Sequence, residues 1–422
     1  MSEGHHVCDV LVVGAGPAGL AAAWRAAESG LRVTVVDDNP AAGGQIWRGK
    51  TASRDAQVWF ERIRGVDVQL INGARVFGQG RPGALLAETS DGVCELSYTS
   101  VILATGARER FLPFPGWTLP NVMGAGGLQA LVKTGLPIEG KRVVVAGSGP
   151  LLLAVAAYLR NCGAEVLLIA EQASLLRLAR FGLGLIPQKK KLSQAWTLKR
   201  EFSRKSEKAQ SLRYLSGCWV VAAQGKDKLE SVTLFRRGKR WQVACDYLAY
   251  GYHLVPNVEL AELLGCVVED GSVRVDEFQQ TTVAQVYSAG ETTGIGGLEL
   301  SVVEGEIAGL AVAGKREAAS RLFPIRAKHK RFAELLNRTF ALRDELKRLV
   351  EPDTIVCRCE DVTFNRLRSY DSWRAAKLQT RCGMGPCQGR VCGGAVEFLF
   401  GWRPESVRPP VLPVRVESLI RS

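Results

Sequence analysis

The sequence has few histidines and no long apolar run. Four histidines occur among 422 residues, and none of them falls in a recognisable catalytic setting: His5, His6, His253 and His329. Histidine is the commonest general acid or base near neutral pH, so no residue is an obvious candidate for abstracting a proton. The longest apolar stretch, at 151–159, is much shorter than the ~20 residues of a membrane-spanning helix, which predicts no direct membrane span.

The sequence also contains no secretory segment and no nucleic-acid motif. Its first residues are polar and lead directly into a strand-like segment, and its clustered cysteines favour metal ligands over disulfides. These features predict a cytoplasmic protein that reaches the inner face of a membrane only through partners. The net charge is +13, with 55 basic and 42 acidic residues. Because the basic stretches at 189–208 and 315–348 contain few aromatic residues, we expect a solvated or subunit-docking face and no nucleic-acid partner.

Two segments share one plan of strand, glycine turn, helix and strand. In the first, apolar residues at 10–13 lead into the turn GAGPAG at 14–19, an alanine-rich helix and a strand that ends at Asp37. The second occupies 142–171 and contains the turn GSGPLL at 147–152. Each segment is typical of a βαβ unit whose opening turn can bind a nucleotide.

The first turn has the features of an FAD site. Gly14 makes the tight turn, Gly16 lets the backbone approach a pyrophosphate, and Gly19 allows close packing of helix on strand. The unpaired N–H groups and the dipole at the helix start favour the bound anion. Asp37 closes the second strand, where its carboxylate can accept hydrogen bonds from ribose hydroxyls. The cofactor-binding candidates in this unit are Gly14, Gly16, Pro17, Ala18, Gly19 and Asp37.

Three further segments favour FAD over NAD. One is a glycine-rich segment after Asp37, one is a small-residue turn after the strand at 101–103, and one is a later strand that ends beside a carboxylate able to bind a ribityl hydroxyl. Their candidates are Gly43, Gly44, Gln45, Ala104, Thr105, Gly106, Gly290 and Glu291. Over residues 7–315 these features resemble the two-dinucleotide-domain flavoproteins, which include glutathione and thioredoxin reductases. Glu291 departs from the aspartate usual in that family.

The second glycine turn fits a nicotinamide site less well. Leu152 replaces the third glycine, and alignment of the two units places Ala170 where Asp37 stands. Glu171 then follows one residue late, so we expect its side chain to point to the opposite face. Nicotinamide binding, an adenine nucleotide without redox function and an empty site kept for packing all stay open. No Cys-x-x-Cys motif lies near either unit, so dithiol chemistry is not expected.

Five of the eleven cysteines are concentrated near the C-terminus, in CRC at 357–359 and CGMGPCQGRVC at 382–392. Four thiolates are the usual ligand set of a [2Fe–2S] centre, and the predicted set is Cys357, Cys359, Cys387 and Cys392. Cys382 is an alternative ligand. Pro386 suits the first turn of a helix, which would place Cys387 near the positive end of the helix dipole. Structural zinc and a metal-free fold are the rival interpretations.

This module resembles the small bacterioferritin-associated-ferredoxin-like (BFD-like) [2Fe–2S] domain, in the form fused to amino-acid dehydrogenase α subunits. The matching residues are VCRCEDVT at 356–363 and TRCGMGPCQGRVC at 380–392. GGQIWR at 43–48 and GSGPLLL at 147–153 extend the similarity to nearly the whole chain. The group that it resembles comprises α subunits of opine oxidases and of hydroxyproline and proline dehydrogenases, and the FAD subunit of hydrogen cyanide synthase.

The resemblance implies the electron-transfer α subunit of a heteromeric amino-acid or imino-acid dehydrogenase. A separate β subunit of the FAD-dependent amino-acid oxidase type would oxidise the C–N bond of an opine, proline, hydroxyproline or glycine. Whether the complex also contains a small third subunit stays open. Electrons would then pass through the [2Fe–2S] centre to the FAD of this chain. The alternatives are an NAD(P)H-dependent ferredoxin- or disulfide-reductase-like flavoprotein, and an assembly subunit with structural zinc and a non-cycling flavin.

The predicted fold is α/β, with two interleaved Rossmann-like dinucleotide-binding domains and a small helical C-terminal [2Fe–2S] domain. The predicted boundaries are an FAD-binding domain at 1–110 and 256–316, a second nucleotide-binding domain at 111–255, a helical linker at 317–352, the [2Fe–2S] domain at 353–405 and an extended tail at 406–422. Apolar spacing predicts basic amphipathic helices between 315 and 349.

Overall fold

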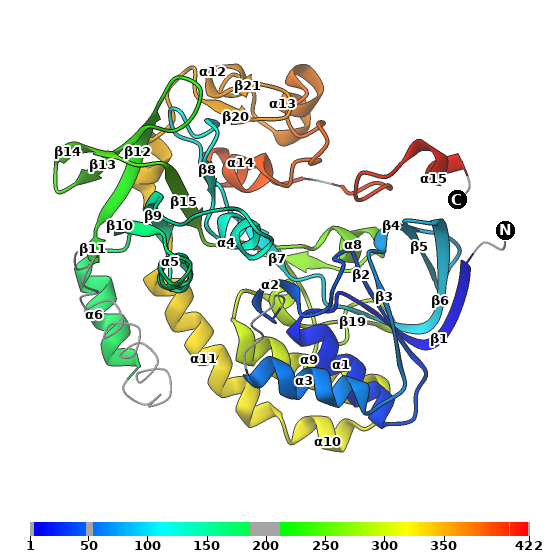
Figure 1. The fold of residues 1–422 in the computed structure, drawn as a ribbon. Coiled ribbons are helices and arrows are strands. Elements are labelled where there is room, and N and C mark those ends of the chain that lie inside the picture. Colours follow the sequence, from blue (N-terminus) through cyan, green and yellow to red (C-terminus); the bar gives the residue numbers. More distant parts are fainter. Residues whose placement is uncertain (1–3, 48–53, 186–211, 405, 421–422) are drawn as a thin grey trace. The chain divides into compact units, whose positions relative to one another are not determined.

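The computed structural model describes residues 4–47, 54–185, 212–404 and 406–420 (Figure 1). The basic stretch at 189–208 lies outside these residues. Two compact units are formed, each from segments that are distant in the sequence: residues 1–108, 255–334 and 406–422 in the first, and 109–254 and 335–405 in the second. The chain therefore leaves the first unit and returns to it.

The first unit is built on a seven-stranded sheet. Its strands are β1 (Gly4–Val13), β2 (Val33–Asp37), β3 (Val68–Asn72), β4 (Arg75–Gln79), β5 (Ala84–Thr89), β6 (Gly92–Leu103) and β19 (Val286–Ser288). The order is β3-β2-β1-β6-β5-β4, and β19 also pairs in parallel with β6. β1 pairs in parallel with β2 and β6, and all five residues of β2 are buried, as expected for a parallel strand covered on both faces.

The helices α1 (Pro17–Glu28) and α9 (Leu298–Val312) of this unit approach each other closely. A Cβ atom on Gly305 would lie 2.1 Å from the Ala18 carbonyl oxygen, and one on Gly309 would lie 2.3 Å from that of Ala22. Glycine is therefore required where the two backbones meet. Other elements of the unit are α2 (Gly44–Trp47), α3 (Arg54–Arg64), α8 (Glu259–Leu263), β17 (Val268–Glu269), β18 (Ser272–Val273), η1 (Gly290–Thr293) and α10 (Arg316–Ser320).

The second unit has a five-stranded sheet in the order β11-β10-β9-β15-β8, and its pairs are parallel. These strands are β8 (Val122–Gly124), β9 (Arg142–Ser148), β10 (Glu165–Glu171), β11 (Arg213–Ser216) and β15 (Tyr247–Tyr252). Beside it are helices α4 (Ala125–Lys133), α5 (Leu151–Asn161) and α6 (Leu175–Gly184), and an antiparallel sheet of β12 (Cys218–Gln224), β13 (Ser231–Arg236) and β14 (Lys239–Ala244). The predicted α/β class with two Rossmann-like sheets is confirmed.

The segment after α10 contains the predicted helices and then the cysteine module. The helices are α11 (Phe323–Thr339) and the 3₁₀ helix η2 (Asp344–Arg348). The module has its own small core, which includes Val356, Val362, Leu367, Trp373 and Val396. Its elements are β20 (Ile355–Cys357), β21 (Val362–Thr363), α12 (Phe364–Leu367), α13 (Trp373–Thr380) and α14 (Cys392–Phe400).

The prediction that a helix begins at Pro386 is wrong. Gln388 and Gly389 have φ values of +49° and +81°, left-handed conformations that a right-handed helix cannot contain. The helix α14 begins instead at Cys392. Cys392, and not Cys387, therefore lies at a helix N-terminus.

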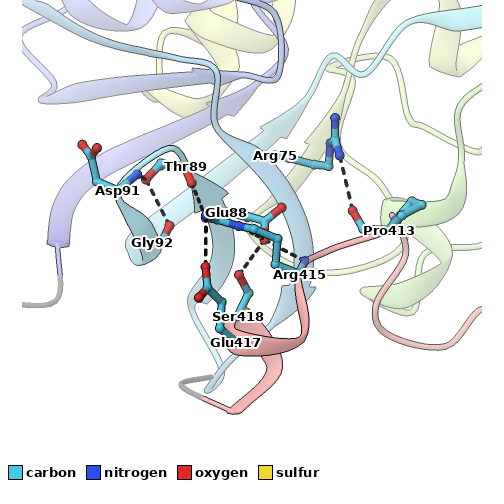
Figure 2. Close-up of polar contacts among 9 residues, drawn as sticks. All are labelled: Arg75, Glu88, Thr89, Asp91, Gly92, Pro413, Arg415, Glu417 and Ser418. Atoms are coloured by element: carbon cyan, nitrogen blue, oxygen red, sulfur yellow. Dashed lines mark hydrogen bonds and ion pairs between the residues drawn. The ribbon is translucent and has the colours of Figure 1, made fainter.

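The C-terminal tail lies on the first unit (Figure 2). The Val411 N–H donates to the Phe77 carbonyl at 2.8 Å. Glu88 Oε1 accepts hydrogen bonds from Arg415 N at 2.9 Å and from Ser418 Oγ at 2.5 Å, at the start of the short helix α15 (Val416–Ile420). Arg415 also donates to the Thr89 carbonyl at 2.7 Å. Within the described ranges, no helix combines the length and apolar character that crossing a bilayer requires.

Glu88 is expected to control the attachment of this tail. Burial raises the pKa of Glu88, but hydrogen bonds from Ser418 and Arg415 outweigh it and hold that pKa below its usual range. The stabilisation is thus complete above the ordinary carboxyl pKa of about 4.3 and is lost as the pH falls through the lowered value. We expect Glu88→Gln to weaken tail docking by about 1 kcal/mol at neutral pH, measured as faster limited proteolysis within residues 406–420.

Glu417→Gln is the matched control, because Glu417 is 61% exposed and its ion pair with Arg415 Nη1, at 3.1 Å, lies within the tail. This variant should be cleaved at the wild-type rate. Equal rates of cleavage of the Glu88→Gln and wild-type tails would contradict the role of Glu88 in attaching the tail.

Candidate functional site

The three glycines of the first turn have different structural roles. Gly14 has a φ of +108°, and a Cβ atom there would lie 2.2 Å from the Ala104 carbonyl oxygen. A Cβ on Gly19 would lie 1.8 Å from the Gly14 carbonyl oxygen. Gly16 differs, because a Cβ there would meet no described atom within 4 Å. Gly14 and Gly19 are needed for packing, whereas Gly16 leaves open space in front of the turn.

The start of α1 and the end of β2 meet at this turn. Gly16 is the N-cap of α1 and Pro17 is its first residue, and no side chain caps the helix. The Asp37 carboxylate is largely buried and accepts hydrogen bonds from Ala15 N at 2.6 Å and from Asn39 N at 2.8 Å. The acid is therefore held against the turn, and the uncapped helix start is suited to an anion.

The glycine-rich segment after Asp37 lies directly against the same turn. The Gly43 N–H donates to the Ala15 carbonyl at 2.8 Å. A Cβ atom on Gly44 would lie 3.1 Å from the Gly16 Cα, and Gln45 follows in α2. These candidates are thus brought together with Gly16.

The ends of β6 and β19 bring the other candidates to this edge of the sheet. The Ala104 N–H donates to the Val13 carbonyl at 2.8 Å, which places the turn after β6 beside the end of β1. Thr105 Oγ1 donates to the Asn257 carbonyl at 2.7 Å, and Gly106 accepts from Asn257 N at 2.9 Å. The Thr105 side chain therefore holds a neighbouring loop in place.

One oxygen of the Glu291 carboxylate accepts a hydrogen bond, and the other has no partner among the described residues. Its Oε1 accepts from Gly297 N at 2.9 Å, while its Oε2 is buried and has no hydrogen-bond partner among the described residues. Burial raises the pKa of Glu291. An orphaned buried carboxylate oxygen is unfavourable unless a ligand completes it, so Glu291 fits the expected contact with a ribityl hydroxyl.

Sequence reasoning missed Glu304 in α9. Its side chain is 2% exposed and accepts from Gly290 N at 3.1 Å and from Thr293 Oγ1 at 2.8 Å. Burial raises its pKa, and Lys330 lies 4.0 Å away. The only sequence signal was one of three glutamates in a helix segment whose other residues are small or apolar. Glu304 fixes the turn that carries Gly290 and Glu291.

The second turn has its own carboxylate, contrary to expectation. Glu171 Oε2 accepts from Gly149 N at 2.8 Å, and Oε1 accepts from Ala173 N at 2.8 Å. The prediction that Glu171 points to the opposite face is wrong because β10 contains a bulge: Val166 pairs with Val143 and Leu168 with Val144. The extra residue shifts the alternation of side chains along β10 by one position, so the Glu171 side chain lies on the same side as the second turn. Burial raises the pKa of Glu171 to about 7.

A later segment of the same chain is hydrogen-bonded to residues beside the second turn. Ser148 Oγ donates to the Phe340 carbonyl at 2.9 Å, and Gln172 Nε2 donates to Ser148 Oγ at 2.9 Å. Arg177 also donates to the Ala341 carbonyl at 2.9 Å. Ser148 and Phe340 are 5% and 4% exposed. Residues 340–341 are therefore bonded to the residues beside this turn, while a Cβ atom on Gly149, the counterpart of Gly16, would also meet no described atom within 4 Å.

The cysteine module brings three thiols together. The sulfur atoms of Cys357, Cys382 and Cys392 all lie within 4.8 Å of one another, and all three residues are buried. Two of them belong to the predicted ligand set, and Cys382 is the alternative. Cys359 is exposed and Cys387 is half-buried, and these two predicted ligands lie beside each other outside the buried trio.

The backbone is wrapped tightly around these sulfur atoms. The Gly383 N–H donates to Cys357 Sγ at 3.5 Å, and a Cβ atom on Gly385 would lie 2.3 Å from the Cys359 Cβ. Hydrogen bonds from Cys382 and Cys392 lower the pKa of Cys357. A thiolate is the form that binds metal, and convergent buried sulfur ligands suit zinc or iron–sulfur chemistry. The donor set thus fits a soft metal centre.

Comparisons with known proteins agree with this geometry. Residues 8–315 match the family described as pyridine nucleotide-disulphide oxidoreductase. Hydrogen cyanide synthase subunit HcnB of Pseudomonas protegens is 31% identical over 428 residues, which cover 91% of this chain and 90% of that protein. The A subunit of opine oxidase from Agrobacterium tumefaciens is 30% identical over 478 residues, which cover 97% of this chain and 91% of that protein.

Among solved structures, L-proline dehydrogenase from P. horikoshii is similar, with a TM-score of 0.71 at 20% identity, and the match covers 99% of this chain and 80% of that one. At this identity the likeness concerns the fold. The group resemblance predicted from the sequence is confirmed, and the chain has the fold of a flavoprotein oxidoreductase.

Substitutions in the first turn should separate ligand binding from folding. Gly16→Ala places a methyl group in open space, so we expect the apoprotein to keep the wild-type midpoint of thermal unfolding but to lose at least tenfold in FAD affinity. Gly19→Ala forces a methyl group onto the backbone, so we expect a loss of about 1–3 kcal/mol of stability. Flavin per chain, released by denaturation and measured by absorbance, and thermal unfolding are the two measurements. Wild-type flavin content in Gly16→Ala would contradict the expected FAD site at the first turn.

Proposed function

The chain belongs to the pyridine nucleotide-disulphide oxidoreductase family, and we propose that it is the electron-transfer α subunit of a heteromeric amino-acid or imino-acid dehydrogenase. A β subunit of the amino-acid oxidase type would oxidise the C–N bond of an opine, proline, hydroxyproline or glycine. This chain would relay the electrons to an acceptor. The support is the similarity, over more than nine-tenths of the chain, to proteins named as subunits of opine oxidase and hydrogen cyanide synthase.

FAD is proposed to lie at the first turn. Gly14, Gly16, Gly19 and the start of α1 would hold the pyrophosphate, Asp37 the ribose, and Glu291 a ribityl hydroxyl. The orphaned Oε2 of Glu291 and the open space at Gly16 are the observations that fit this group. A bound flavin exchanges electrons either in pairs or singly, which is the chemistry that a relay requires.

An iron–sulfur centre is proposed in the cysteine module, with Cys357, Cys359, Cys387 and Cys392 as ligands. Cys357 and Cys392 also belong to the buried trio of thiols, which makes them the most constrained part of this set. A [2Fe–2S] centre transfers one electron at a time. The backbone N–H of Gly383, directed at Cys357 Sγ, is a donor of the kind that tunes such a centre.

Two observations argue that electrons enter from a partner subunit. The second turn is hydrogen-bonded to residues 340–341 of the same chain, which disfavours NAD(P)H binding there. His253, the histidine adjacent to the end of β15, has Nε2 3.0 Å from Asn337 Oδ1, and burial lowers its pKa. Its environment is explained by packing, so proton abstraction is assigned to the partner.

The test is to compare the purified chain alone with its complex. Under anaerobic conditions, proline, glycine or an opine should bleach the flavin only when a second flavoprotein of oxidase type co-purifies with the chain. NADH should leave the flavin of the isolated chain oxidised, because residues 340–341 are bonded to Ser148 and Gln172 beside the second turn. Substrate oxidation by the chain alone, or rapid bleaching by NADH, would contradict the proposal.

Single cysteine substitutions identify the ligands. We expect Cys392→Ser and Cys359→Ser to abolish bound iron and the visible absorbance of the cluster, and Cys382→Ser to retain both. Iron analysis and the absorbance spectrum are the measurements. If Cys382→Ser lost its iron and Cys359→Ser retained it, the ligands would belong to the buried trio of thiols and not to the proposed set.

A further inference from the structure

A cleft in the second unit is separate from the second glycine turn and from the cysteine module. Its volume is about 690 Å³, within the usual range for small-molecule sites. The start of α6, the junction of β11 and β12, the strands β13 and β14 and residues 343–349 contribute to its lining. Of the described residues, none of 147–152 and none of the five clustered cysteines lines it. A ligand in this cleft would therefore occupy neither of those sites.

Basic side chains dominate the charge of this cleft. Four arginines line it, against a single acid, Glu345. The four are Arg237, Arg240, Arg343 and Arg348. Arg343 Nη2 donates to Glu345 Oε1 at 2.6 Å, and the Arg343 Cζ lies 5.0 Å from the centroid of the Trp219 ring. Among the residues that the structure describes, the other three arginines form no ion pair. Most of the positive charge in the cleft is therefore uncompensated.

The three unpaired arginines come from two elements that are distant in the sequence. Arg237 occupies the turn between β13 and β14, with a φ of +50°, and Arg240 pairs with Phe235 in that hairpin. Arg348 is the last residue of η2. All three arginines are exposed, so their guanidinium groups are charged and accessible. Because a cleft lined by charges of one sign attracts ions of the opposite sign, this arrangement indicates an anion that reaches both elements.

The acid already present in the cleft indicates which anion. A guanidinium group can donate two parallel hydrogen bonds to a carboxylate, and Arg343 already binds the carboxylate of Glu345. The hydrogen bond from Arg343 lowers the pKa of Glu345, so this acid is ionised at neutral pH. Apolar lining residues, among them Val221 and Leu349, add a surface suited to the carbon skeleton of an organic anion. The lining therefore favours a carboxylate-bearing organic molecule over an inorganic ion.

We propose that this cleft binds a small organic anion with two or more carboxylate groups, through Arg237, Arg240 and Arg348. Such a molecule would bring carboxylates to guanidinium groups of both elements and would thereby join η2 to the hairpin of β13 and β14. Its binding is reversible, and no bond is made or broken. The inference goes beyond the proposed function and does not depend on it, because neither a partner subunit nor electron transfer is required.

Isothermal titration calorimetry of the purified full-length chain with tricarballylate tests the proposal. Tricarballylate is a tricarboxylate that lacks the hydroxyl group through which citrate chelates iron. At low ionic strength, in a buffer without carboxylate or phosphate, we expect one site per chain. Arg240→Gln and Arg348→Gln each remove one guanidinium group and should each weaken binding by about three- to tenfold. Because both positions are exposed, both variants should keep the wild-type midpoint of thermal unfolding.

The matched control is Arg213→Gln. Arg213 is an exposed residue of the same unit that does not line the cleft, so this variant loses the same charge at a different place. Its affinity for tricarballylate should stay within about twofold of wild type, because solvent and salt screen an exposed charge outside the cleft. An equal loss of affinity in Arg213→Gln, Arg240→Gln and Arg348→Gln would show attraction to the whole basic chain and would overturn the site.

Glu345→Gln should change the affinity in the opposite direction. This variant removes the acid that competes with the ligand for the arginines, so we expect binding to tighten by about two- to fivefold. Asp344→Asn is its control, because Asp344 is 90% exposed, pairs with Lys347 at 3.0 Å and does not line the cleft. Weaker binding by Glu345→Gln than by wild type would contradict the proposed placement of the carboxylates.

Inorganic pyrophosphate is the second titrant, and it separates carboxylate from phosphate recognition. If pyrophosphate binds more tightly than tricarballylate, the carboxylate class is overturned. Absence of tricarballylate binding, or binding that both Arg240→Gln and Arg348→Gln leave unchanged, would overturn the cleft as a site. These titrations need no partner subunit and no amino-acid substrate. A negative result therefore leaves the proposed function standing, and failure of the complex to oxidise an amino acid leaves this site standing.

Discussion

A carboxylate at the end of a parallel strand holds each glycine turn by a backbone N–H group. Asp37 accepts from Ala15 N at 2.6 Å, and Glu171 accepts from Gly149 N at 2.8 Å. These bonds fix the turns where the first strand of each βαβ unit passes into its helix, the position at which nucleotide folds bind phosphate. The rest of the architecture brings further segments to these two turns, and their different surroundings carry the functional argument.

The two turns differ in what lies in front of them. At the first, Gly16 faces open space, and the segments of Gly43, Ala104 and Glu291 gather at the same sheet edge. At the second, residues 340–341 are hydrogen-bonded to Ser148 and Gln172. In a family whose fold has two dinucleotide domains, this chain thus has a second turn whose neighbouring side chains are bonded to residues 340–341, which favours electron entry from a partner over entry from NAD(P)H.

Much of this arrangement could be predicted from the sequence, because glycine turns flanked by apolar strands are local patterns. Asp37 and the return of the chain to the first sheet at β19 could be predicted from such local patterns. The orientation of Glu171 could not be predicted, since the bulge at Leu167 adds one residue without any change in the apolar pattern. The contact of Phe340 with Ser148 beside the second turn joins residues far apart in the sequence, and the hydrogen bond from Gly290 to Glu304 joins a turn to the helix that follows it. Sequence spacing alone carries no information about them.

The account depends on the metal centre proposed for the cysteine module, where three buried thiols converge and two further thiols lie beside each other. The most direct test is the electron paramagnetic resonance spectrum of the reduced full-length chain, recorded together with its metal content. The account predicts a reduced [2Fe–2S] signal and about two irons per chain. One equivalent of zinc without iron, and no such signal, would contradict it.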